Sequence, residues 1–177
     1  MSEALADDFK QAMRRLAATV AIITSRRDGE WIGMAATAVS AVSADPPSLV
    51  IGVNKSASLH DALVISRSFC VNLLTPPHND LVPPFSGKSK GQERFAFGRW
   101  EGHASGVPFL TDALASLFCQ VDAELSYGSH TLFVGRVEAI RMAEATDPLI
   151  WQDGRCAAAR PLSLLGLGGE AAAAAGR

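Results

Sequence analysis

The chain has 177 residues, of which 48% are apolar and only 19% charged, and its 16 Lys and Arg against 18 Asp and Glu give a formal net charge of −2. This length suits a single domain with its own core, and the balanced charge excludes the basic face of a nucleic-acid-binding protein. No apolar run reaches the roughly 20 residues of a membrane-spanning helix, and the acidic start lacks the pattern of a signal peptide. We therefore expect a cytoplasmic protein whose surplus apolar surface is covered by a partner or a ligand.

The first part of the chain predicts one helix and a β-hairpin. Apolar residues recur at three- and four-residue steps, which indicates an amphipathic helix, at Leu5, Phe9, Met13 and Leu16. The β-branched residues 17–25 indicate a strand. Asp28 and Gly29 then suit a tight turn, because both tolerate the positive φ that a two-residue hairpin needs. The return strand starts near Trp31.

Short strands and turns make up the rest of the chain. Strands are predicted at residues 48–53, 69–74, through 121–126, at 130–142 and around 149–158, and a short helix at about 58–66. Residues 75–90 contain four prolines and read as a loop or short irregular helices. Hairpin-joined strands without βαβ units predict a mainly β fold with short helices, a closed antiparallel barrel rather than a doubly wound sheet.

The cysteines and histidines give no sign of a metal site. Cys70, Cys119 and Cys156 are odd in number, widely spaced and without a CxxC pair, which argues against disulfides and a zinc cluster. Cys70 and Cys119 stand in apolar runs and are predicted to be buried rather than nucleophilic. The four histidines show neither HxH nor HExxH spacing, so no metal is expected.

The return strand of the first hairpin continues as a run of small residues, 33–43. Such a run leaves the backbone open to close approach by a flat ligand or by another backbone. The hydroxyls of Thr37, Ser40 and Ser43 would help to bind a polar, planar ligand. The alternative is tight packing of a helix or a partner subunit.

Two further segments collect groups that bind anions. Residues 54–58 end a strand and start a helix, so hydroxyls, the Lys55 ammonium and helix-start N–H groups converge there. Plain capping is the alternative, and Ser58 to Asp61 has the outline of a capping box. In residues 85–88 a glycine stands beside Lys88, and with Arg94 this segment would close over an anion or remain a solvated loop.

A histidine follows a tight turn in the sequence Tyr127-Gly128-Ser129-His130. At the mouth of a strand pair His130 is predicted to be half-exposed, where it would bind or donate to a substrate near neutral pH. A purely structural histidine is the alternative.

Together these segments resemble the flavin reductase-like family, the FMN-binding split barrels that serve as small reductase components of two-component flavin monooxygenases. The resemblance covers residues 9–161. Six motifs carry it in the family's order: GMAATAVSAVSADPPSLVIGVNKSASLHDAL, FCVNLL, FSGK, GVPFLTDALASLFC, YGSHTLFVGRV and PLIWQDGR. It implies an antiparallel split β-barrel domain over residues 1–162. The Gly- and Ala-rich composition predicts a flexible tail over 163–177.

The resemblance also implies a homodimer with a flavin near its interface. The flavin ring and ribityl chain would be lined by Thr37, Ala38, Val39, Ser40 and Ser43. The phosphate end would be held by Asn54, Lys55, Ser56 and Ser58, supported by Ser86, Gly87, Lys88 and Arg94. The catalytic residue would be His130, and the nicotinamide would be bound by His130, Trp151, Gly154 and Arg155. Where the family has an Asp in the turn, this chain has Ser129, which can orient His130 but not raise its pKa.

The activity implied is that of an NAD(P)H-dependent flavin reductase, an oxidoreductase that passes a hydride from NADH or NADPH to FMN or FAD. The reduced flavin would go to a partner monooxygenase. Because the cofactor carries this chemistry, the protein needs neither paired carboxylates nor a nucleophile triad. Three alternatives stay open: a non-catalytic flavin- or haem-binding sensor or storage protein on the same barrel, an enzyme like the pyridoxine-phosphate oxidases, and a purely structural protein.

Overall fold

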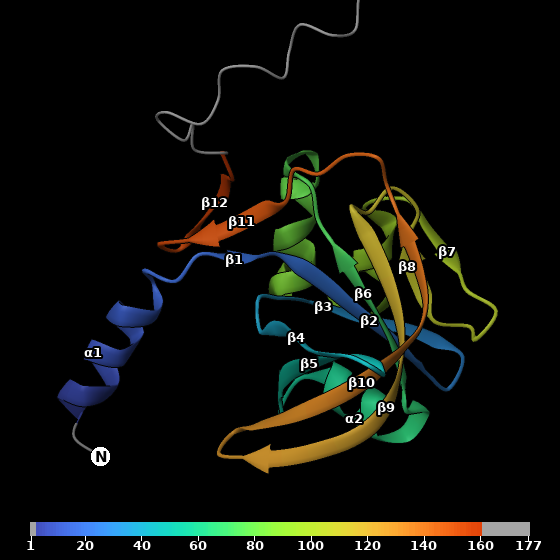
Figure 1. Ribbon diagram of the computed structural model, residues 1–177, viewed down its shortest axis with the longest axis horizontal. Coiled ribbons are helices and arrows are strands. Elements are labelled where there is room, and N and C mark those ends of the chain that lie inside the picture. The colour runs from blue at the N-terminus through green and yellow to red at the C-terminus, as the bar shows by residue number, and fades with distance from the viewer. Residues whose placement is uncertain (1–2, 161–177) are drawn as a thin grey trace, which may run out of the picture.

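The computed structural model describes residues 3–160, and Figure 1 shows their arrangement. The helical elements are α1 (Glu3–Met13), α2 (Ser58–Ser66) and the short segments η1 (Pro76–Leu81), η2 (Pro84–Lys88) and η3 (Gly91–Ala96). The strands are β1 (Ala18–Thr19), β2 (Ala21–Arg27), β3 (Glu30–Ala36), β4 (Val39–Ala44), β5 (Pro47–Asn54), β6 (Ser68–Leu73), β7 (Trp100–Gly102), β8 (Pro108–Leu110), β9 (Ala115–Tyr127), β10 (His130–Met142), β11 (Leu149–Gln152) and β12 (Arg155–Ala158). The tail expected over 163–177 lies outside the described residues.

A seven-stranded sheet forms the body of the protein, in the order β3-β2-β6-β9-β10-β5-β4. All of its pairings are antiparallel, which confirms the predicted mainly β, antiparallel fold. The edge strands β3 and β4 follow each other in the chain, joined only by residues 37–38. No ladder joins β3 to β4 in the described part of the chain, so the sheet stays open at this junction rather than closing as a continuous ladder.

Local sequence explains the first hairpin and the break before it. Asp28 and Gly29 adopt φ of 54° and 82°, as the predicted turn requires. The strand expected over 17–25 is split in two at Val20. There Val20 N–H donates to Leu149 O, and Val20 O accepts from Leu74 N–H. The chain therefore passes at Val20 from the small sheet β1-β11-β12 into the large sheet.

Two apolar clusters occupy opposite sides of the strands. The larger includes Ile23, Ile51, Phe69 and Phe133 and is covered at one end by Leu59 and Leu63 of α2. The other packs Val20 and Ile22 under the short helical segments, against Leu81, Phe85 and Leu110. Because alternate residues of β2 enter different clusters, residues 21–25 of this strand are buried throughout.

Apolar side chains also remain on the surface. The predicted amphipathic helix is confirmed as α1, but Phe9 and Leu16 are each 62% exposed. Figure 1 shows α1 standing apart from the sheet, and the β9–β10 hairpin reaching away from the body. On that hairpin Leu125 is 61% and Tyr127 81% exposed. Part of the apolar surplus of the composition thus lies exposed on these two projections.

Buried polar groups join the strands to the segments beside them. The side-chain amide of the fully buried Asn72 donates to Ile22 O at 3.0 Å. Its Oδ1 accepts from Leu110 N–H at 2.9 Å and from the Ser116 hydroxyl at 3.1 Å. Asn72 thereby links β2, β6, β8 and β9 within the core.

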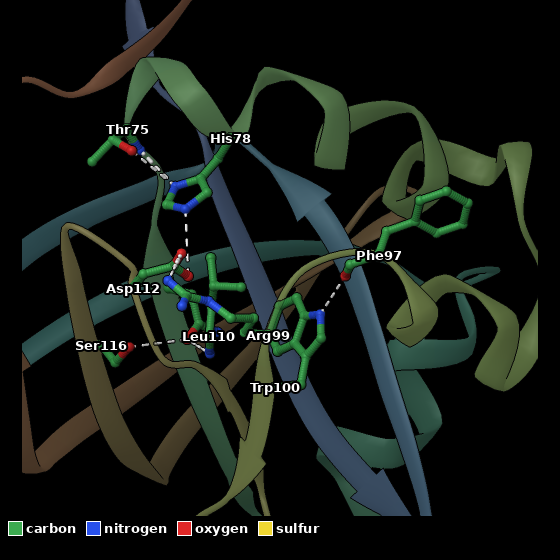
Figure 2. A network of polar contacts seen from close by, with 9 residues as sticks. Thr75, His78, Phe97, Arg99, Trp100, Leu110, Asp112 and Ser116 are labelled. Atoms are coloured by element: carbon green, nitrogen blue, oxygen red, sulfur yellow. Dashed lines mark hydrogen bonds and ion pairs between the residues drawn. The ribbon is translucent and has the colours of Figure 1, made fainter.

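A second polar network anchors η1, as Figure 2 shows. Arg99 donates to Asp112 Oδ2 at 2.8 Å, and Asp112 Oδ1 lies 3.5 Å from His78 Nε2. His78 Nδ1 accepts from the Thr75 backbone N–H at 3.2 Å, which leaves Nε2 as the protonated nitrogen that faces Asp112. The network fixes η1 against the loops on either side of β7 and β8.

Replacing Asp112 with Asn is expected to destabilise the protein only above acidic pH. Partial burial acts to raise the pKa of Asp112, but the Arg99 hydrogen bond and the electrostatic interaction with His78 outweigh it and lower this pKa. The stabilisation is therefore present above the unfolded-state pKa of about 3.9 and is lost as pH falls through the lower folded-state value. Thermal unfolding should show D112N melting about 3 °C lower at neutral pH and level with wild type in strong acid. D80N, on the exposed side of η1, is the control; an equal deficit at every pH would contradict the prediction.

Candidate functional site

The first cavity lies at the opening of the sheet and has a volume of about 180 Å³. It is lined by Val20, Ala35, Ala36, Thr37, Val82, Ser86 and Trp151. Thr37, Ser86 and Trp151 come from three distant segments that the sequence singled out for the flavin or the nicotinamide. The fold brings them together because η2 packs against β3 while β11 pairs with β1 beside it.

A larger groove, of about 460 Å³, adjoins this cavity through the shared residues Thr37 and Trp151. One wall is α1 and the residues that follow it, with Phe9, Met13 and Leu16, and the other includes Ala38 and Gly154. The β11–β12 turn is held to the end of α1, because Asp153 N–H donates to Arg14 O at 2.8 Å and Arg14 Nε donates to Asp153 Oδ1 at 3.2 Å.

The small-residue run has two structural roles. A Cβ on Gly33 would stand 3.0 Å from the Phe85 ring, so this glycine admits a packed side chain, as the packing alternative expected. Farther along, Val39, Ser40 and Ser43 lie on the edge strand β4, which pairs with β5 alone within residues 3–160. The free edge of β4 leaves backbone groups available to a ligand. The Ser43 hydroxyl already donates to Asp45 O at 2.9 Å and shapes the following turn.

The start of α2 differs from the predicted capping box. Its N-cap is Ala57, and no side chain in the described structure caps the helix, because Ser58 is already its first helical residue. Ser56 instead donates both its N–H and its hydroxyl to Asn54 Oδ1, at 2.9 and 2.8 Å. This local turn leads the chain into α2 and leaves the partial positive charge of the helix start uncapped by any side chain.

A third cavity, of about 130 Å³, brings Ser58 at this helix start together with Arg94 of η3. Arg27, Glu30, Trp31 and Gln92 also line it. No local pattern predicts these four, because they meet only when the β2–β3 hairpin packs beside η3. Arg94 donates to the carbonyl oxygens of Gly33 and Ser89.

Arg94 is a cation without a neutralising partner. Burial lowers the pKa of Arg94, yet no carboxylate of the described chain forms an ion pair with it, and its Nε is buried with no hydrogen-bond partner there. An uncompensated guanidinium beside an uncapped helix start is suited to an anion such as a phosphate. The residues present therefore fit the phosphate end of a flavin.

The other predicted phosphate ligands are divided. Ser86 lines the first cavity, and Gly87 follows it in η2 with a φ of 104° that favours glycine. Lys88 is the exposed last residue of η2. Lys55 lies away from all three cavities, and its ammonium donates to Gly128 O at 2.8 Å. The anion-binding groups thus surround the opening of the sheet without converging on one point.

His130 stands at the tip of the β9–β10 hairpin, paired across the strands with Asn54 and Tyr127. It is exposed, where the turn predicted half-exposure, and its Nδ1 lies 2.9 Å from the Ser129 hydroxyl. Ser129 thus has the contact needed to orient the ring. His130 lines none of the three cavities described, whereas Trp151 and Gly154 do. Within one chain the predicted nicotinamide residues therefore fall in two places.

The buried thiols are inert, as predicted. Burial, reinforced by the charge of Glu138, raises the pKa of Cys119 to about 12. Burial likewise raises the pKa of Cys70 well above its usual value. Both thiols stay protonated near neutral pH and serve as apolar core groups.

An antiparallel sheet opened beside two cavities, with an uncompensated cation near a helix start, defines a protein suited to a flat ligand with an anionic tail. The model of the "Flavin reductase like domain" matches residues 13–160, and the chain belongs to this family of oxidoreductases. The resemblance drawn from the six motifs is thereby confirmed.

Named relatives agree. The chain is 39% identical over 164 residues to the reductase component of the FADH(2)-dependent resorcinol hydroxylase of Rhizobium sp. (strain MTP-10005), with 92% of each protein covered. It is 41% identical over 143 residues to the FMN reductase (NADH) RutF of Pseudomonas syringae pv. syringae (strain B728a), covering 81% of this chain and 80% of that protein. The flavin reductase PheA2 in its native state superposes with a TM-score of 0.79 at 31% identity, over 91% of this chain and 100% of that one.

Proposed function

We propose that this protein is an NAD(P)H-dependent flavin reductase that supplies reduced FMN or FAD to a separate monooxygenase. The observation that carries the proposal is the sheet opening, where Thr37 and Trp151 line both the cavity and the adjoining groove. The relatives named as an FMN reductase (NADH) and as the reductase component of a hydroxylase support it. When bound, the flavin would accept a hydride from the nicotinamide.

The protein's own share of this reaction is placement. Backbone groups of the free edge strand and of the connection before it would meet the polar edge of the flavin ring, at Thr37, Ala38, Val39, Ser40 and Ser43. The phosphate end would be neutralised by Arg94 with Ser58, which line one cavity, and Asn54 and Ser56 would contribute from the turn before α2. Lys55, Ser86, Gly87 and Lys88 lie elsewhere within one chain and would join this site only if the ligand or a second copy brought them together. His130 would position the nicotinamide and balance charge, together with Trp151, Gly154 and Arg155. Fixed dipoles and rings held in contact suit a hydride transfer that needs no acid–base residue of the protein.

A turnover assay tests the proposal. Purified protein with each flavin and each nicotinamide should bleach the visible band of the oxidised flavin in the absence of oxygen. In air, where oxygen re-oxidises the reduced flavin, it should consume the reduced nicotinamide over many turnovers. A non-catalytic flavin-binding protein would leave the band unchanged. An enzyme like the pyridoxine-phosphate oxidases would instead make hydrogen peroxide from pyridoxine phosphate. Either of these results would overturn the proposal.

Replacing Arg94 with Ala should weaken binding of FMN about tenfold, because a charge-assisted hydrogen bond to the phosphate is lost. Riboflavin, which has the same ring system but no phosphate, should bind the variant and the wild type about equally. Fluorescence quenching of each flavin measures both constants. R15A, which removes an exposed arginine elsewhere, is the matched control. Equal loss of FMN and riboflavin would show that Arg94 acts on the fold and not on the phosphate.

The homodimer belongs to the same proposal. Phe9, Met13 and Leu16 line a groove with Trp151 and stay largely exposed, and the exposed β9–β10 hairpin carries His130. A second copy would cover these apolar surfaces and bring the two groups of nicotinamide residues near each other.

We also place the protein in the cytoplasm, since its three free cysteines fit a reducing compartment. None of the described helices is long and apolar enough to span a membrane.

Phe9→Glu is expected to convert this dimer to a monomer. A charge in a desolvated apolar contact costs several kcal/mol, a large part of the roughly 8 kcal/mol of association free energy that holds a micromolar dimer together. Light scattering coupled to size exclusion measures the mass. Gln11→Glu places the same charge on the opposite side of α1 and should leave the mass unchanged. An unaltered mass for F9E would contradict the use of this face.

A further inference from the structure

The turn that carries His130 is held by a contact with the start of α2. His60 Nε2 lies 2.9 Å from Thr131 Oγ1, within hydrogen-bond distance. The contact is secluded, since the His60 side chain is 16% exposed and Thr131 is 6% exposed. The His60 ring also meets the Phe133 ring edge-on, at 5.5 Å between centroids and 65° between planes.

Thr131 connects this buried contact to the surface. Neighbouring residues of a strand point to opposite faces, so Thr131 turns toward the interior where His130 turns outward. The burial of the two residues agrees, because Thr131 is buried and His130 exposed. A displacement of the Thr131 backbone would therefore also move the adjoining residue His130.

Two more hydrogen bonds reach the turn from the same segment. Lys55 N–H donates to Ser129 O at 2.9 Å, and the Lys55 ammonium donates to Gly128 O at 2.8 Å. Residues 55–60 thus hold the 128–131 turn at three points. The same segment begins α2, whose first residue Ser58 lines the cavity of Arg94.

We propose that His60 and Thr131 are positioning residues, which hold His130 in register for the nicotinamide from the segment that receives the flavin phosphate. The inference rests on the proposed function. In this proposal the start of α2 serves two ligands. Its backbone N–H groups face the anion cavity, and its His60 side chain fixes the turn that carries His130, the residue that contacts the nicotinamide. Ordering of residues 55–60 by a bound phosphate would then also order His130.

A pair of Thr131 variants tests the proposal. Thr131→Val keeps the shape of the residue and removes the hydroxyl, whereas Thr131→Ser keeps the hydroxyl. T131V should raise the KM for the preferred nicotinamide about tenfold, because a displaced His130 would lose most of its hydrogen bond to that ligand. The Kd for FMN should stay within about twofold of wild type. T131S should behave as wild type. If T131V shifts the FMN Kd as much as the KM, or shifts neither, the proposal is overturned.

The His60 side gives an independent arm if T131V unfolds. His60→Gln places an amide near the position of Nε2, and His60→Leu keeps bulk without a polar group. At equal thermal stability, H60Q should keep a nicotinamide KM close to that of the wild type, whereas H60L should raise it. Equal KM values for H60Q and H60L would overturn the proposal.

A double variant separates positioning from general stability. In a His130→Ala background, adding T131V should raise the nicotinamide KM no further, since the residue being positioned is gone. A further tenfold increase would show that Thr131 acts otherwise and would overturn the proposal. Absence of flavin reduction by the wild type would instead overturn the proposed function. An active wild type with an unaffected T131V overturns the positioning role alone.

Discussion

Asn72→Leu is expected to lower the free energy of unfolding by about 3–5 kcal/mol, the largest stability loss that we expect from a single side chain in this fold. Leucine has the same branched four-atom side chain but bulkier methyl groups, so the change opens no cavity and adds some overpacking. It removes every hydrogen bond that the Asn72 amide makes at a site with no solvent access. With a total stability of typically 5–15 kcal/mol, the variant would keep only a fraction of it.

The cost arises from the partners that Asn72 leaves behind. The Leu110 N–H, the Ser116 hydroxyl and the Ile22 carbonyl would each lose a bond inside the core. An unsatisfied buried donor or acceptor costs about 1–3 kcal/mol, because water cannot replace the lost partner. Since these groups belong to three strands, their loosening also weakens the contact between the sheet and β8.

Thermal and urea unfolding measure the effect, and the melting temperature should fall by about 10 °C. Asn79→Leu makes the same replacement at an exposed position of η1 and should change stability by less than about 0.5 kcal/mol. A melting temperature of N72L within 2–3 °C of wild type, roughly the effect of 1 kcal/mol, would show that the network contributes little.

Asn72 also explains how far the sequence could predict this protein. It belongs to FCVNLL, one of the motifs that carried the family resemblance. In the structure, however, Asn72 links strands inside the core and does not line a cavity for a ligand. The motif could identify the family correctly without revealing what its polar residue does. Strands, hairpins and α2 were predictable because alternation, turn residues and apolar spacing are local signals.

The site was predictable only in parts, because it is assembled from long-range contacts. Thr37, Ser86 and Trp151 were each singled out, but nothing local states that they line one cavity. The capping box expected at Ser58 failed because the Asn54 side chain, which shapes the turn before the helix, moved the N-cap to Ala57. His60 gave no signal at all, since its importance depends on a residue 71 positions later.

His130→Ala is expected to raise the KM for the nicotinamide about 30-fold while leaving the Kd for FMN near wild type. The exposed ring sits apart from the cavities that Thr37, Ser58 and Arg94 line, so its loss should not disturb the flavin. Ser129 contacts only the far nitrogen of the ring, at Nδ1, which leaves Nε2 for a ligand. A loss of about 2 kcal/mol, typical of a hydrogen bond to a charged group, corresponds to this factor.

Steady-state kinetics with the nicotinamide varied at saturating FMN gives the nicotinamide KM, and fluorescence quenching of FMN gives its Kd. His130→Gln keeps a hydrogen-bond donor at about the same distance from the backbone, so its nicotinamide KM should lie between those of H130A and the wild type. Because the turn is held by Lys55 and Thr131 rather than by the ring, both variants should unfold at the wild-type temperature. A weakened FMN Kd with unchanged nicotinamide kinetics would place His130 on the flavin instead, and would move the nicotinamide site to the Trp151 groove alone.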